Sequence, residues 1–256
     1  MRNIIMILLL APLLLSCQKY NKDPYDKFEE DYRKMTSLNP DKIYLDSLWS
    51  KRDSLTYLNM KNVELVLLSE TDSIPNWLFN FKNLKIIFTN NELKKIKRIP
   101  SNIDNAKGLM QFDIPNNAIN NIPKSFYKLN NLETTDLSKN PIKELSPDIE
   151  NLLNLRGLTL RNTLISNLPS EICKLSKLES LVLENTKIYE LPKCLGNLQH
   201  LEWINISGTQ ITEFPIEILN APKLETIHAR GLKLKNYKEV KAICEKRNIT
   251  FYYDHE

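Results

Sequence analysis

The chain has 256 residues, of which 42% are hydrophobic and 26% are charged, and its formal net charge is +4. This composition excludes a disordered chain as the default, and only 5 glycines leave little room for long flexible linkers. A net charge this small, without a run of basic residues interleaved with aromatics, predicts no nucleic-acid partner.

Residues 1–16 have the features of an export signal. Arg2 supplies a positive start, and the apolar run from Ile4 to Leu15 is interrupted only by Pro12. A run of this length is too short to cross a hydrocarbon core of ~30 Å as a lone helix, which needs about 20 residues. We therefore predict a targeting segment that takes no part in the fold.

The signal closes with Leu14-Leu15-Ser16-Cys17, which resembles the lipobox of bacterial lipoproteins. The resemblance implies cleavage behind Ser16 and diacylation of the Cys17 sulfur. The alternative is an ordinary signal peptide that is cut elsewhere. Because each buried CH₂ contributes about 0.8 kcal/mol, two or three acyl chains would anchor the protein durably to a membrane.

Residues 17–23 would then form the lipid anchor and a short tether. Gln18 stands where inner-membrane lipoproteins of enteric bacteria carry an aspartate. The resemblance therefore implies a location in the bacterial cell envelope, and it favours the outer membrane over the inner membrane. The order Gln18-Lys19, with Asp23 nearby, is also similar to the export tag of some surface-exposed lipoproteins.

Residues 24–60 are predicted to form a helical N-terminal cap. Asp23 can cap a helix that has Pro24 in its first turn. Four apolar residues then share one face: Tyr25, Phe28, Tyr32 and Met35. This stripe fits either a dimer contact or a cover for the first unit of a repeat array, and we favour the cover and a monomer. Whether 41–60 continues the cap or forms a degenerate repeat stays open.

The central feature is a leucine that recurs every 23 residues. It stands at Leu109, Leu132, Leu155, Leu178, Leu201 and Leu224. A fixed period of this size is the signature of a solenoid. Within one period Leu158 and Leu160 alternate by two, as in a strand with one buried face, whereas Ile172 and Leu175 are three apart, as in a helical or 3₁₀ turn.

In each coil the chain therefore runs in one direction as a strand and runs back as a helical turn, with its leucines pointing inward. A lone coil cannot close its core, so stacked copies must cover one another. One polar position recurs where the chain leaves each strand: Asn117, Asn140, Thr163, Thr186 and Thr209. Buried backbone groups there need a partner, and Thr should supply a weaker one than Asn.

The pattern resembles the leucine-rich repeat family, in the subtype LxxLxLxxNxIxxLPxxIxxLxx, over residues 61–234. The resemblance implies an α/β fold: a right-handed solenoid, or horseshoe, with a parallel concave sheet and a convex side of short helical or 3₁₀ turns. Departures from the pattern are Thr for Asn in the later coils and Ser146-Pro147 where Leu-Pro is usual.

The second clear coil is longer than the standard one. It runs from Leu84 to Leu109 and so spans 25 residues, with the extra residues near 91–97. Insertions in solenoids become loops at one edge and can bind ligands, but a basic stretch such as this one is more often a solvated loop. Whether Ile86 and Phe88 or Ile87 and Thr89 point inward is ambiguous.

Residues 235–256 are predicted to be an α+β C-terminal cap. Asn236 can cap the start of a helix, and Asn248 can end that helix in the left-handed conformation. Residues 249–253 are then predicted to form a strand.

The remaining cysteines are Cys173, Cys194 and Cys244. An odd number cannot all pair within the chain. Cys173 and Cys194 lie in neighbouring coils, but at different offsets from their prolines. We therefore expect free, partly buried thiols, with a Cys173–Cys194 disulfide as the alternative.

No catalytic or metal-binding constellation is evident. A catalytic thiol needs a base held beside it, and the histidines show no such pairing in the sequence. The zinc spacings C-x-x-C and H-E-x-x-H, the P-loop and the G-x-S-x-G motif are absent. We predict a protein that is not an enzyme and needs no metal or cofactor.

Function should then lie on the concave face, which the residues alternating with the buried strand positions would form. The candidate ligand-binding residues are Asp113, Asp136, Thr159, Arg161, Glu184, Trp203, Asn205, His228 and Arg230. Trp203 stands out because the residues at the equivalent strand position of the other coils are small or polar. It is either an interface anchor or a shield for a neighbouring coil.

Two hypotheses follow. The first is a membrane-anchored, non-catalytic module that binds a protein or a glycan on its concave face. The second is a structural envelope lipoprotein whose repeats act as a spacer without a specific ligand. The identity of a ligand cannot be read from the repeats, because they encode shape while a few side chains encode the ligand.

Overall fold

A computed structural model describes residues 43–45, 63–69 and 71–254, which belong to one compact unit, Ile43–Glu256. The predicted signal segment, Cys17 with its tether and nearly all of the predicted cap 24–60 lie outside the described residues. No helix within the described ranges is long and apolar enough to cross a bilayer.

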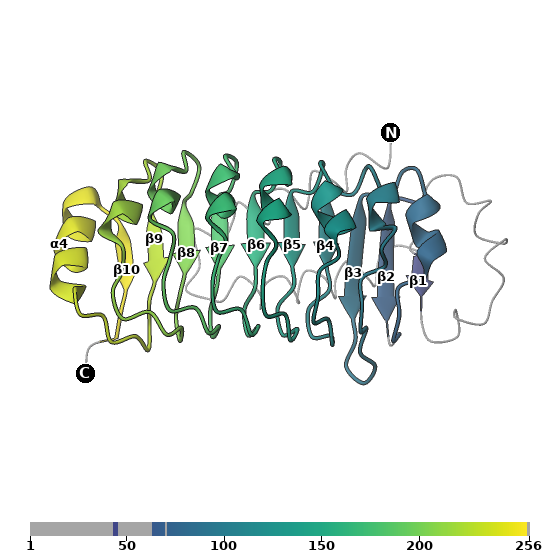
Figure 1. Ribbon diagram of the computed structural model, residues 1–256, viewed down its shortest axis with the longest axis horizontal. Coiled ribbons are helices and arrows are strands. Elements are labelled where there is room, and N and C mark those ends of the chain that lie inside the picture. Colours follow the sequence, from purple (N-terminus) through teal and green to yellow (C-terminus); the bar gives the residue numbers. More distant parts are fainter. Residues whose placement is uncertain (1–42, 46–62, 70, 255–256) are drawn as a thin grey trace. The chain divides into compact units, whose positions relative to one another are not determined.

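Ten parallel strands form one sheet in the order of the sequence (Figure 1). The strands are β1 (Ile43–Leu45), β2 (Leu65–Ser69), β3 (Ile86–Asn90), β4 (Gln111–Asp113), β5 (Thr134–Asp136), β6 (Gly157–Thr159), β7 (Ser180–Val182), β8 (Trp203–Asn205), β9 (Thr226–His228) and β10 (Thr250–Tyr252). From β4 to β9 each residue pairs with the one 23 positions later, as Leu158 does with Leu181. The predicted parallel solenoid is confirmed.

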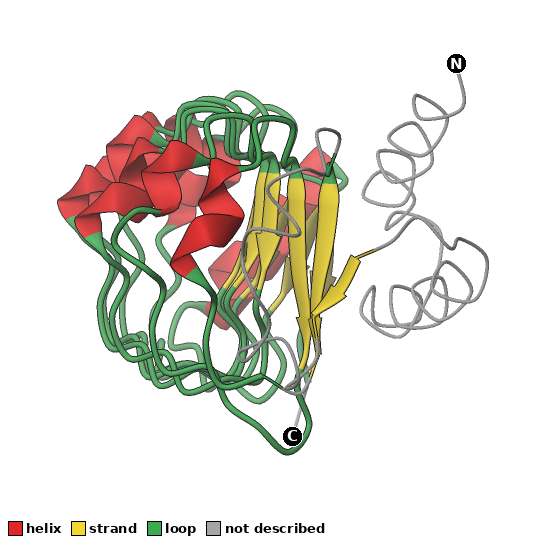
Figure 2. Ribbon diagram, turned by 90° about the vertical axis from the view of Figure 1, so that its right-hand side faces the viewer, coloured by secondary structure: helices red, strands yellow, loops and turns green. Residues whose placement is uncertain are grey.

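Short 3₁₀ helices return the chain on the side opposite the strands (Figure 2). They are η3 (Asn76–Asn80), η4 (Ile103–Asn105), η5 (Lys124–Lys128), η6 (Pro147–Asn151), η7 (Ser170–Lys174), η8 (Lys193–Asn197) and η9 (Ile216–Asn220). Five of them follow an extended proline, such as Pro169 before η7. Where the usual Leu-Pro is replaced, Ser146 caps η6 by accepting a hydrogen bond from the Asp148 amide.

The repeated apolar residues fill the space between strands and helices. In the coil taken as the pattern, Leu168 is 9% exposed, and the other six inward residues are at most 1% exposed: Leu155, Leu158, Leu160, Ile165, Ile172 and Leu175. In the second coil Ile87 is the inward residue, fully buried and in register with Val66 and Phe112. Ile86 and Phe88 therefore belong to the concave face, which settles the ambiguity of this strand.

The predicted polar ladder is present, and it shows why Asn and Thr differ. Asn140 is 1% exposed; its Nδ2 donates to the carbonyl oxygens of Ile114, Leu137 and Ser138, and its Oδ1 accepts from the Ile119 amide. Ile114 and Ile119 lie in the preceding coil, so this side chain joins two coils. Thr163 donates only to the Leu160 carbonyl of its own coil.

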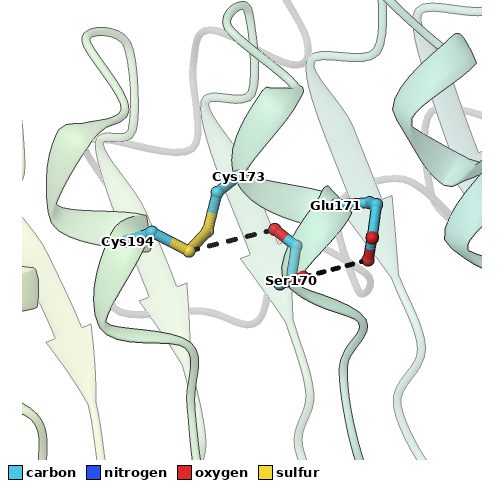
Figure 3. The surroundings of a disulfide bond; sticks show 4 residues. All are labelled: Ser170, Glu171, Cys173 and Cys194. Atoms are coloured by element: carbon cyan, nitrogen blue, oxygen red, sulfur yellow. Dashed lines mark hydrogen bonds between the residues drawn. A yellow bond between two sulfur atoms is a disulfide. The ribbon is translucent and has the colours of Figure 1, made fainter.

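Cys173 and Cys194 form a disulfide between η7 and η8 (Figure 3). The expectation of two free thiols is wrong. The different offsets bring the two Cα atoms to 5.8 Å, within the usual range for a disulfide, because neighbouring coils are staggered. Cys244 is the free cysteine of the described chain, and it is buried.

The C-terminal cap consists of α4 (Tyr237–Arg247) and β10. Asn248 ends α4 in the left-handed region at φ 56°, as predicted. Asn236 does not cap the helix through its side chain, which was the expected role. The Asn236 side-chain amide instead accepts a hydrogen bond from the Phe214 backbone N–H and donates one to the Phe214 carbonyl oxygen, so it connects the cap to the preceding coil.

Candidate ligand-binding surface

Two columns of side chains line the concave face in register. The first column contains Gln111, Thr134, Gly157, Ser180, Trp203 and Thr226. The second contains Asp113, Asp136, Thr159, Val182, Asn205, His228 and Tyr252. Because parallel strands lie about 4.8 Å apart, the predicted candidates from β4 to β9 are spread over roughly 24 Å and do not converge on one point.

At the C-terminal end three half-buried rings adjoin across β8, β9 and β10, and we call Trp203, His228 and Tyr252 the aromatic row. The Trp203 and His228 ring centroids are 5.7 Å apart, edge to face, and those of His228 and Tyr252 are 4.5 Å apart. The Arg230 guanidinium lies 5.5 Å from the Tyr252 ring centroid, and its Nε is 3.9 Å from Asp254 Oδ1. Trp203 thus packs on the next coil, as the shielding interpretation expects, and it keeps a half-exposed surface.

Next to the row lies a polar network on β6 to β8. Arg161 forms an ion pair with Glu184 at 3.3 Å, and Asn205 Nδ2 donates to the other Glu184 oxygen at 3.2 Å. Asn205 Oδ1 also accepts from the Ser207 amide at 3.0 Å. Because Asn205 is only 7% exposed, it supports Glu184 and offers little surface of its own.

Asp113 and Asp136 face each other on β4 and β5. Asp113 accepts from Gln111 Nε2 at 2.6 Å and from the Asp136 amide at 2.8 Å, and Asp136 accepts from the Ser138 amide at 2.8 Å. Burial raises the pKa of Asp113 to about 7 and the pKa of Asp136 to about 6. Asp113 is 8% exposed, so the structure places it within the sheet's hydrogen bonding and away from open surface.

Thr159 is half-buried between the acidic pair and the polar network. The structure thus brings Trp203 and His228 together, with Arg230 close to the row, and joins Arg161, Glu184 and Asn205. It leaves Asp113, Asp136 and Thr159 apart from both groups.

Tyr252 is a site residue that the sequence reasoning missed. The strand at 249–253 was expected, with Ile249, Phe251 and Tyr253 on one side. The alternation that places Phe251 inward also places Tyr252 outward, in register with His228. Recognising that this strand continues the parallel sheet would have revealed the residue.

A second aromatic cluster lies at the end of the solenoid, where a cleft of about 290 Å³ is lined in part by Tyr237, Phe251 and Tyr253. The Tyr237 and Tyr253 rings stack with centroids 4.5 Å apart. Phe251 and Tyr253 pack against the last buried core residues. We assign this cluster to covering the open end of the core.

The arrangement suits binding and offers little for catalysis. Among the described residues no group of three or more His, Cys, Asp or Glu side chains could hold a metal ion. Burial raises the pKa of the free thiol Cys244 to about 11, so it is a poor nucleophile at neutral pH. The surface can instead offer ring faces, a guanidinium, a carboxylate and amides to a ligand.

A 23-residue coil of strand and 3₁₀ turn, a leucine core and an Asn/Thr ladder are together the features of the leucine-rich repeat fold. In agreement, residues 153–211 match the family described as leucine rich repeat. No curated protein matches the chain in sequence.

Several solved structures have a similar fold. A leucine-rich repeat protein of Leptospira interrogans superposes with a TM-score of 0.68 and 24% identity, over 78% of this chain and 57% of the other. The leucine-rich repeat domain of the type III effector XopL gives 0.64 and 18%, over 94% and 98%. An internalin of Listeria monocytogenes gives 0.63 and 19%, over 79% and 66%. The chain thus spans little more than half of the Leptospira protein, and at these identities the likeness concerns the fold.

Proposed function

We propose that the protein is a non-catalytic binding module that captures a protein or a glycan with the C-terminal half of its concave face. The aromatic row is the observation that carries this proposal. Parallel sheets are normally covered on both faces. Here one face is covered by the 3₁₀ side, while the rings of β8 to β10 remain half-exposed on the other.

The chemistry of this surface supports a recognition role. Tyr, Trp and Arg are enriched among residues whose truncation costs about 2 kcal/mol or more of binding energy, and here all three types lie on β8, on β10 and just after β9. Trp203 and Tyr252 are held by ring contacts, so little conformational entropy is lost when a ligand covers them. Glu184 and Arg161 border the row and can fix the orientation of a polar ligand.

We propose further that Cys17 carries acyl chains that hold the protein in a bacterial envelope, with the outer membrane as the expected location. The Cys173–Cys194 disulfide supports export, because disulfides persist in the periplasm and outside cells and are rare in the cytosol. Mass spectrometry of the purified chain should find Cys17 N-terminal and acylated. Protease treatment of intact cells would then distinguish a surface-exposed protein from a periplasmic one.

Binding can be tested by immobilising the chain and probing it with a glycan array and with envelope and host extracellular proteins. The double change Trp203→Ala and Tyr252→Ala should weaken capture at least about 30-fold, which corresponds to about 2 kcal/mol. Tyr189→Ala is a matched control, since Tyr189 is an aromatic residue that is 52% exposed and lies outside the row. Unchanged capture by the double variant would refute the concave site, and no reproducible capture by the native chain would favour the spacer.

A further inference from the structure

The turn that follows β3 differs from the turns of the other coils. The coil that contains it is two residues longer than the 23-residue standard. In Figure 1 this turn projects beyond the row formed by its neighbours. Its two ends are fixed in the solenoid, because Asn91 is 3% exposed and Ile96 is fully buried.

Hydrogen bonds hold the base of the turn in one conformation. Asn91 donates to Asn117 Oδ1 at 2.9 Å, and the same oxygen accepts from the Ile96 amide at 2.9 Å. Lys95 Nζ crosses the base and donates to the carbonyl oxygens of Asn91 at 3.1 Å and Asn116 at 2.8 Å. The projecting tip therefore stands on a rigid support.

An apolar side chain occupies this tip. Leu93 is 88% exposed, the highest value among the large hydrophobic residues of the described chain. Leaving a leucine in water forgoes the favourable free energy that its burial would supply. A turn that only needed to be soluble would carry a polar residue here.

Basic residues surround the leucine. Residues 91–98 contain Lys94, Lys95, Lys97 and Arg98 against the single acid Glu92.

Several basic residues on other parts of the coils form an ion pair with an acidic residue of an adjacent coil. Lys128 pairs with Asp104, Arg156 with Glu179 and Lys174 with Glu150. Within the described residues no ion pair involves Lys97 or Arg98. Their charge therefore remains available to an external anion.

We propose that this turn is a contact site for an anionic membrane surface, with Leu93 entering the headgroup region and Lys97 and Arg98 binding lipid phosphates. Each such basic residue strengthens binding to an anionic surface, and one inserted apolar side chain adds to it. An acidic protein partner is less well matched, because the exposed apolar surface is a single projecting side chain and not a patch.

The inference rests on the proposed anchoring and extends it from attachment to orientation. The aromatic row lies five to seven strands from β3 along the sheet, or roughly 24 to 34 Å at the usual strand spacing. Contact through the β3 turn would therefore leave the ligand-binding surface clear of the bilayer. The anchored protein would present a defined face and would not rotate freely on its tether.

The test uses the full-length lipidated chain with Leu93→Trp, reconstituted on vesicles of phosphatidylglycerol and phosphatidylcholine with brominated acyl chains. Emission from position 93, corrected for the native tryptophans, should fall by at least about half. It should recover in high salt, on pure phosphatidylcholine, and in the background Lys97→Glu and Arg98→Glu. Leu153→Trp is the matched control, because Leu153 is 59% exposed and lies just before a strand. Its emission should be unchanged.

Flotation of the same samples separates the two proposals. A chain that floats with the vesicles and shows no quenching at position 93, or equal quenching at 153, refutes the contact and leaves the anchoring intact. A chain that does not float refutes the anchoring and, with it, this contact. Equal thermal unfolding of the variants and the native chain establishes that the exposed substitutions leave the fold unchanged.

Discussion

Replacement of Asn140 by alanine tests whether the polar ladder holds neighbouring coils together. Asn140 makes four hydrogen bonds to backbone groups. Two of these groups have second partners: the Ile114 carbonyl also accepts from Asn117, and the Ser138 carbonyl accepts from the Asn116 amide. The Ile119 amide and the Leu137 carbonyl would lose their partner.

The magnitude follows from those two groups. A buried backbone group without a hydrogen bond costs about 1–3 kcal/mol, so Asn140→Ala should lower the free energy of unfolding by about 3–4 kcal/mol. Asn140→Thr should cost about half as much, because a threonine hydroxyl can reach the carbonyl of its own coil, as Thr163 does with Leu160. The threonine cannot accept from Ile119 in the same way.

Urea unfolding followed by circular dichroism measures both values. The native threonine at position 163 allows the reverse substitution as a control. Thr163→Asn should stabilise the fold by about 1 kcal/mol, because an Asn there can accept from the Ile142 amide of the preceding coil. Equal losses for Asn140→Ala and Asn140→Thr, or no gain for Thr163→Asn, would refute the argument that Asn joins coils while Thr serves only its own.

Two further predictions concern covalent and ionisable groups. The disulfide closes a loop of roughly 20 residues, so the double change Cys173→Ser and Cys194→Ser should lower the free energy of unfolding by about 3 kcal/mol. Reductant should bring the native chain to the same urea midpoint as the double variant and leave the double variant unaffected. The acidic pair should make the free energy of unfolding fall as pH rises from about 4 to about 7. The pKa of Asp113 is raised from 3.8 to about 7 and the pKa of Asp136 from 3.8 to about 6. Over this range the folded chain therefore retains protons that the unfolded chain has released. Replacing both with Asn should flatten the urea midpoint across this range, and an unchanged slope would show that the two carboxyl groups are not buried as described.

Much of the fold could be predicted because each coil repeats the same local rule. The leucine period identifies the inward residues, and the alternation in Leu158-Thr159-Leu160 separates core from surface. The Ile86/Ile87 ambiguity arose because the two apolar residues are adjacent, so the alternation offered two answers. Pairing with Val66 and Phe112 on the neighbouring strands selected Ile87.

The candidate surface was predicted less completely. Alternation correctly placed Asp113, Trp203 and Asn205 on one face of the sheet, but it carries no information on what covers that face. The hydrogen bonds of Asp113 and Asn205 and the ring contact of Trp203 involve residues 21 to 25 positions away in the chain. The role of Asn236 was missed for the same reason, since its partner Phe214 belongs to the previous coil.

By itself, the sequence determined that this protein is a stack of 23-residue coils with a leucine interior and a free strand face, because a period is a local property that every copy repeats. Only the tertiary structure decided which residues of separate coils meet: the Cys173–Cys194 bridge, the Trp203–His228–Tyr252 row and the support beneath Leu93. The physical reason is that the stagger and rise between coils set these distances, and they arise from the packing of whole coils, which no single repeat encodes.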